Sequence, residues 1–143
     1  MAAEAAQVHA DWYPEYGHLY DSRTRELIEE GFGITVRKLA EALTGRQRLR
    51  HSLMSQMDSV GIDLWIAPAA VGPADPGLSS TGDPIMNLPW THAGLPVVSL
   101  PTSVNHMGLP MGIQLAGRWY GDEVLMEWGA EIERDLALER VWS

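Results

Sequence analysis

The fold is decided by residues 87–117, which read NLPWTHAGLPVVSLPTSVNHMGLPMGIQLAG. Two apolar runs lie within this stretch, at 97–100 and 111–115, and each is too short for a helix and is bounded by proline or glycine. These features predict two strands. Because neither run alternates cleanly between apolar and polar residues, we expect both strands to be buried on both faces, in a sheet that helices cover on both sides. The stretch therefore predicts an α/β fold.

The preceding segment supplies a third strand and a long helix. Residues 63–68 (DLWIAP) predict the strand, and a helix from Thr35 to about Met57, ended by Gly61, leads into it. The apolar face of this helix is expected to contain Val36, Leu39, Leu43, Leu53, Met57 and Val60. Its arginines are expected on a solvated face: Arg37, Arg46, Arg48 and Arg50.

Helices are also predicted near both ends of the chain. Ser22 is expected to N-cap a helix through Glu30, and Asp122 to N-cap a closing helix to about Leu136. Residues 11–20 predict an aromatic loop that packs on a neighbouring helix, and residues 1–10 predict either a frayed helix or a tail. The closing helix is expected to lay one apolar face on the sheet, through Leu125, Trp128, Ile132 and Leu136.

Composition limits the classes of function. The chain has 143 residues, which suits one domain, and no cysteine, which excludes a disulfide framework. Its formal net charge of -9 argues against nucleic acid or an anionic membrane as a partner, because both require a basic surface. No apolar run approaches the roughly 20 residues that span a bilayer, and the first residues lack a signal-peptide pattern. We therefore expect a cytoplasmic protein.

The order of the punctuating residues resembles that of one family. The pattern N-x-P-W-T-x-x-G-L-P-x-x-S-L-P, followed by G-L-P-x-G-I-Q-L-x-G, resembles the C-terminal part of the amidase signature enzymes, which are serine hydrolases of carbon–nitrogen amide bonds. The resemblance covers about residues 12–143. It implies the C-terminal lobe of a mixed sheet flanked by helices, so that residues 1–143 are expected to form a partial amidase domain.

The family's catalytic residues have no counterpart in the matched region. The resemblance implies a lysine and two serines that lie N-terminal to it, one of them in a Gly/Ser-rich segment, and no Gly-Gly-Ser-Ser run occurs here. Lys38, the single lysine, lies in a helical pattern rather than at the strand end that the family uses. We therefore assign no catalytic residue, and expect a small amide substrate only with a complementary catalytic lobe.

Three residues are expected to bind substrate: Asp83, Trp90 and Thr91. Residues 69–86 form a loop after a predicted strand, a common place for ligand contacts, and the resemblance sets this loop beside the acyl pocket. Asp83 lies near the position where a glutamine-dependent member of the family holds a substrate amino group, but its neighbours differ, so no glutamine substrate is inferred. Trp90 and Thr91 resemble a pair beside the family's substrate tunnel; core packing is the alternative.

Other chemistry is not supported by residue spacing. Hydrolase residue types occur without a G-x-S-x-G turn, namely Ser79, Ser80, Ser99, His92, His106, Asp75 and Asp83. The five histidines lack metal-ligand spacing, so neither a metal nor a cofactor is expected. Gln114, a polar residue within an apolar strand, is expected to have a hydrogen-bond partner.

Two functions of different classes follow. The first is the C-terminal segment of an amidase signature hydrolase that acts on carbon–nitrogen amide bonds and is inactive alone. The alternative is a non-catalytic interaction module that pairs through an exposed sheet edge, either with another chain or with itself as a homo-oligomer.

Overall fold

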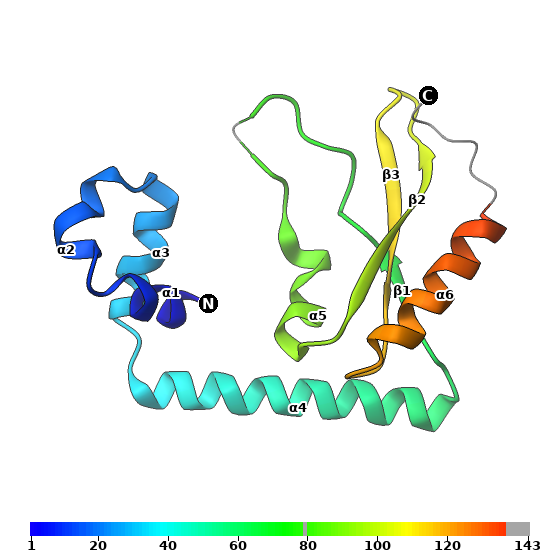
Figure 1. Cartoon of the computed structure of the whole chain (residues 1–143), viewed down its shortest axis with the longest axis horizontal. Helices are drawn as coiled ribbons and strands as arrows, with labels where there is room; N and C mark the ends of the chain where they lie inside the picture. The colour runs from blue at the N-terminus through cyan, green and yellow to red at the C-terminus, as the bar shows by residue number, and fades with distance from the viewer. Residues whose placement is uncertain (79, 137–143) are drawn as a thin grey trace. The chain divides into compact units, whose positions relative to one another are not determined.

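The computed structural model describes residues 1–78 and 80–136 of the chain (Figure 1). Contacts between residues divide it into two compact units, Met1–Gly45 and Arg46–Ser143, and the division falls within the long helix α4 (Val36–Val60). We predicted a single partial amidase domain over residues 1–143, and the division into two units does not test that prediction.

The first unit is helical. It contains α1 (Ala2–His9), α2 (Tyr13–Tyr16), the 3-10 helix η1 (Gly17–Leu19) and α3 (Ser22–Phe32). Helix α1 packs closely on α3 at Gly31, where a Cβ would stand 2.1 Å from the carbonyl oxygen of Ala2, so only glycine permits this approach. Residues 1–10 therefore begin with a packed helix, and residues 11–20 contain two short helices where a loop was expected.

Both helix starts lie one residue away from the prediction. Asp21 rather than Ser22 caps α3, because its carboxylate accepts a hydrogen bond from the backbone N–H of Arg23 at 2.9 Å. Gly121 precedes α6 (Asp122–Asp135), which makes Asp122 the first helical residue. Its negative charge still lies in the first turn, where the helix dipole favours it.

The second unit contains a three-stranded antiparallel sheet in the order β1–β3–β2. The strands are β1 (Trp65–Pro68), β2 (Val97–Val104) and β3 (Pro110–Ala116), and β2 and β3 form a hairpin (Figure 1). At its turn, the side chain of Asn105 accepts hydrogen bonds from the N–H groups of Met107 and Leu109, and Gly108 adopts a φ of 77°. The glycine before Leu109 and Pro110 therefore turns the chain.

Strand β2 extends four residues beyond the predicted end at Leu100. Pro101 pairs with Gly112, and the register then shifts by one residue before Ser103 pairs with Met111. Within the described residues β2 lies at an edge of the sheet, and proline is tolerated at edges and bulges because its missing N–H costs no ladder bond there. The prediction that Pro101 ends the strand was therefore wrong.

Helices cover both faces of this sheet, which confirms the predicted α/β class. On one face, α6 packs through Leu125 against Leu100 and Leu115. On the other face, a cluster around Trp90 and Ala116 includes the short helix α5 (Leu88–Ala93) and residues of α4. Sequence reasoning missed α5, although Pro89 in its first turn and Gly94 just after its end mark a helix.

Several predicted apolar contacts are absent from these faces. Trp128 is 40% exposed, because Gly129 is the residue of α6 that packs against Val98. Val97 is also 40% exposed, so β2 is not buried on both faces in the described structure. In α4, three of the predicted apolar residues are exposed, namely Val36, Leu43 and Val60. Leu53 and Met57 of α4 do pack in the core, as predicted, and Leu49 and Met54 pack beside them.

Candidate functional site

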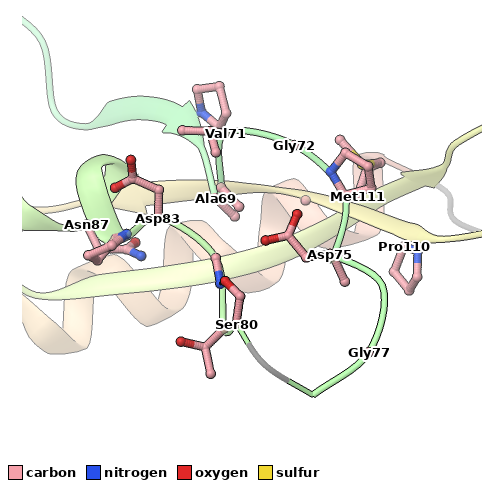
Figure 2. Close-up of a pocket in the computed structure, with 18 residues that line it drawn as sticks. Ala69, Val71, Gly72, Asp75, Gly77, Ser80, Asp83, Asn87, Pro110 and Met111 are labelled. Carbon is pink, nitrogen blue, oxygen red and sulfur yellow. The ribbon is translucent and has the colours of Figure 1, made fainter. Parts of the chain in front are cut away.

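A cavity of about 710 Å³ lies between the loop that follows β1 and the start of β3. The loop runs from Ala69 to the 3-10 helix η2 (Pro84–Met86), and Figure 2 shows it passing through Gly77 and returning toward Asn87. Strand β3 supplies the remaining lining through Pro110, Met111 and Gly112. The prediction that residues 69–86 form a loop at the end of a strand is confirmed, except for η2 and for residue 79, which lies outside the described residues.

One buried amide holds both ends of this loop. Nε2 of Gln114, a residue only 1% exposed, donates hydrogen bonds to the carbonyl oxygens of Pro68 at 2.9 Å and Met86 at 2.8 Å. Pro68 ends β1 and Met86 ends η2, so the two anchors precede and follow the loop. The expected hydrogen-bond partner of Gln114 is confirmed, and its consequence is that the mouth of the loop has a fixed width.

The floor of the cavity depends on a close approach of two strands. A Cβ at Gly112 would stand 2.8 Å from the carbonyl oxygen of Leu100, so a larger residue would push β2 away from β3. The backbone N–H of Ala69 donates to the carbonyl oxygen of Gly112 at 3.0 Å, which extends the β1–β3 pairing past Pro68. Gly112 thus ties the first residue of the loop to the sheet.

The polar groups of the cavity are acidic or neutral. The described residues of its lining include Asp75, Ser80, Asp83 and Asn87, and none of them is lysine, arginine or histidine (Figure 2). Asp83 caps η2 by accepting a hydrogen bond from the N–H of Ile85 at 2.9 Å, which leaves its second carboxylate oxygen for other contacts. The lining therefore favours a ligand that is neutral or positively charged and that donates hydrogen bonds.

The three predicted substrate residues lie in different environments. Asp83 lines the cavity, whereas Trp90 and Thr91 do not. Trp90 is 9% exposed and packs beside Trp65, with their ring centroids 6.4 Å apart, in the core between α4 and the sheet. Thr91 is exposed on α5. Substrate contact by these three residues remains a prediction. Sequence reasoning named Asp75 only as a formally available acid and did not single out Asn87, although both line this cavity.

The described residues hold no assembled nucleophile. The hydroxyl of Ser80 accepts a hydrogen bond from the N–H of Gly82 at 3.0 Å, and no serine among residues 1–78 and 80–136 bonds to a histidine, lysine or carboxylate. Ser79 lies outside the described residues. Lys38 is exposed on α4, as its helical pattern predicted.

Among the described residues, no three histidine or acidic side chains come together in a way that could hold a metal ion. No described helix is both long and apolar enough to cross a membrane.

Comparison with known proteins identifies relatives that are named as amidases or as components of amidotransferases. No family model matches the chain. It is 28% identical over 138 residues to a mitochondrial glutamyl-tRNA(Gln) amidotransferase subunit of Mycosarcoma maydis, in an alignment that covers 89% of this chain and 24% of the relative. It is 27% identical over 139 residues to the putative amidase AmiD of Mycobacterium bovis, covering 90% of this chain and 29% of the relative. The chain thus spans about a quarter of the length of these curated relatives.

Solved structures share the fold. A crystal structure of an amidase matches 94% of this chain, and 33% of its own length, with a TM-score of 0.77 and 24% identity. A bacterial aryl acylamidase of the amidase signature family matches 93% of this chain, and 30% of its own length, with a TM-score of 0.67 and 18% identity. These matches show that the chain shares the fold of part of those enzymes, and together with the sequence relatives they support a C-terminal fragment of the amidase signature family.

Proposed function

We propose that this chain is the C-terminal portion of an amidase signature hydrolase that acts on carbon–nitrogen amide bonds. The observation that carries the proposal is the cavity of about 710 Å³ whose bordering loop is held at both ends by Gln114. A loop with fixed ends can form one wall of a substrate pocket and position an acyl group or an amine there. In this proposal the chain supplies that wall, and another lobe supplies the reactive serine.

The chain alone is proposed to be inactive. Covalent catalysis requires a nucleophile with a base within hydrogen-bond reach, and the described serines have no such partner. One relative is named as a component of an amidotransferase, which supports action together with a partner. A cytoplasmic location is also proposed, since a sequence without cysteine suits a reducing compartment.

Asp83 is the residue best placed to select the substrate. One of its carboxylate oxygens is used by Ile85, and no described cation neutralises the side chain. An amide substrate that carries a free amino group would offer a positive charge and hydrogen-bond donors to this carboxylate. We therefore propose amides with an amino group near the scissile bond as the preferred substrate class. Direct substrate contact by Trp90 and Thr91 remains a further proposal, with core packing as its alternative.

The proposal is tested by restoring a catalytic lobe. The C-terminal part of an active amidase signature enzyme is replaced by this chain, and the chimera and the chain alone are assayed on paired amides that differ only in a free amino group. We expect turnover by the chimera only, and a loss of about tenfold or more in kcat/KM for the amino-bearing amide in Asp83→Asn, from one charge-assisted hydrogen bond. Asp63→Asn, an exposed aspartate outside the cavity lining, is the matched control. Amide hydrolysis by the chain alone, lost on Ser80→Ala, would refute the proposal.

A second candidate function rests on the edges of the sheet. Within the described residues β1 and β2 each pair only with β3, so each has one unpaired edge, and Val97 and Val104 of β2 are exposed. Such an edge is a template for another strand, which favours an interaction module or homo-oligomer. Light scattering over a range of concentrations tests this function: a homo-oligomer that Val97→Lys dissociates supports it, and a monomer at all concentrations excludes self-pairing.

A further inference from the structure

Two arginines of α4 meet at the end of α5. A Cβ at Gly94 would stand 3.0 Å from Nη2 of Arg50 and 3.5 Å from Nη2 of Arg46, so both guanidinium groups lie against the same glycine. Gly94 has a φ of 70° and ends α5, and its missing side chain leaves the space that the two groups occupy. The predicted solvated face of α4 is therefore wrong for Arg46 and Arg50, which are both partly buried.

The contacts of Arg50 explain its position. Its Nε–H donates to the carbonyl oxygen of Ala93 at 2.6 Å, and its guanidinium carbon lies 4.2 Å from the centre of the Trp119 ring. The carbonyl is at the negative end of α5, which favours a cation, and the aromatic face favours a guanidinium. These two contacts fix Arg50 in one orientation.

Among the described residues, Arg46 has no comparable partner. Its Nε is buried and makes no hydrogen bond to any described residue. The ion pairs between described residues, Met1 with Glu4 and Arg118 with Asp58, involve neither Arg46 nor Arg50. Two like charges are thus held together, one of them with a buried unsatisfied donor, and both conditions are unfavourable unless a negative group is bound.

We propose that Arg46 and Arg50 form a binding site for a carboxylate. The guanidinium group presents its donors in a planar fork that matches the two oxygens of a carboxylate, and the Nε–H and Nη2 groups of Arg46 form one side of such a fork. Arg50 supplies a second positive charge that is already oriented by Ala93 and Trp119. This site is separate from the cavity beside β3, which neither arginine lines. It does not depend on the proposed amidase function.

The test uses the whole chain and succinate as the probe. Succinate is titrated at constant ionic strength, balanced with sodium chloride, while the arginine Nε–H resonances are followed by nitrogen–proton NMR. We expect a saturable downfield shift of the Arg46 resonance, because its Nε–H gains an acceptor. Arg46→Gln should weaken succinate binding by about tenfold or more, the loss expected for one charge-assisted contact.

Two further variants keep the result interpretable. Arg48→Gln removes an exposed arginine of the same helix and should leave the binding unchanged. If Arg46→Gln does not fold, Arg46→Lys keeps the positive charge and removes the fork, so it too should weaken binding. The proposal is overturned if the Arg46 resonance does not shift, or if succinate binds Arg46→Gln and the unchanged chain with equal affinity.

The carboxylate could belong to a free organic acid or to an acidic side chain of a partner. A second experiment distinguishes these two sources. The titration is repeated on the chimera with a catalytic lobe. A shifted Arg46 resonance before succinate is added, with no further shift afterwards, identifies an acidic side chain of that lobe. A resonance that responds to succinate as in the chain alone identifies a free acid. Absence of a shift in both arms rejects the carboxylate site.

Discussion

The side-chain nitrogen of Gln114 is joined to the carbonyl oxygen of Met86 by a hydrogen bond of 2.8 Å that spans 28 residues of sequence. The same nitrogen also bonds to Pro68, so a single side chain fixes the start and the end of the loop around the cavity. Because Gln114 lies in β3, the central strand of the sheet fixes the position of the loop, and the loop's own residues do not.

Replacing Gln114 with leucine should therefore loosen the loop and destabilise the fold. Two carbonyl oxygens lose the donor that Gln114, itself 1% exposed, supplies, and a buried polar group left without a partner costs about 1–3 kcal/mol. Thermal and denaturant unfolding measure the loss, and hydrogen exchange should speed up in residues 80–87 first. Gln47→Leu, at an exposed position of α4, is the control and should change stability by less than about 0.5 kcal/mol. Equal stability of the two variants would show that Gln114 does not anchor the loop.

The sequence predicted the parts of the fold that depend on local chemistry. The proline and glycine pattern located β2, β3 and their turn, and the polar residue Gln114 within an apolar strand predicted a hydrogen-bond partner. It could not identify that partner, because Pro68 and Met86 are brought near Gln114 only by the sheet and η2. Local pattern also failed for Pro101, where the position of β2 at the sheet edge overrides the usual effect of proline.

The candidate site was predictable to a smaller extent. Its loop could be found from its Gly, Pro and Ser content, and Asp83 does line the cavity. The proposed role of Arg46 and Arg50 could not be predicted from the sequence. A charged run on a helix has the same pattern whether it faces solvent or another helix. What distinguishes these two arginines from Arg48 is the position of α5, which the sequence pattern did not reveal as a helix.

Gly31 should be essential for the packing of α1 on α3. In Gly31→Ala the new methyl group would stand 2.1 Å from the carbonyl oxygen of Ala2 and 2.7 Å from the Cβ of Ala6, distances at which the backbone must move. We expect α1 to detach, which lowers helix content by circular dichroism and exposes Ala2–His9 to limited proteolysis. Gly33→Ala is the matched control, since its φ of -82° suits alanine and its nearest contact is at 3.4 Å. Resistance of α1 to proteolysis in Gly31→Ala would contradict the packing.

Tyr13 should titrate above the usual value for a tyrosine. Burial of its phenol, and then its hydrogen bond of 2.6 Å to Glu29, raise the pKa of Tyr13 above the usual 10.0, against a smaller opposing effect of Arg25. Because the folded state holds the proton more tightly, this contribution to stability is complete below pH of about 10 and is lost as pH rises through the folded pKa. Ultraviolet titration of tyrosinate, with Tyr13→Phe to assign the signal, measures the shift. Glu29→Gln should lower the pKa, and the exposed control Glu30→Gln should not; identical titrations would refute the assignment.

Replacing Trp90 should mainly lower the stability of the fold. Its ring is 9% exposed and contacts the core between α4 and the sheet, and removing a buried aromatic side chain costs about 3–5 kcal/mol, so Trp90→Ala is expected to unfold far below the unchanged chain. Trp128→Ala, at a tryptophan that is 40% exposed on α6, is the matched control and should cost much less.

The same variant separates a core role for Trp90 from a direct role in substrate choice. In the chimera with a catalytic lobe, a core residue should lower kcat/KM for all amides by one factor, because the fraction of folded enzyme falls equally for each. A residue that contacts the acyl group should instead change the ranking of amides, by about 1–3 kcal/mol between small and large acyl groups. Trp90 does not line the described cavity, so we expect the uniform loss. A changed ranking at a temperature where Trp90→Ala is fully folded would place Trp90 in the substrate pocket.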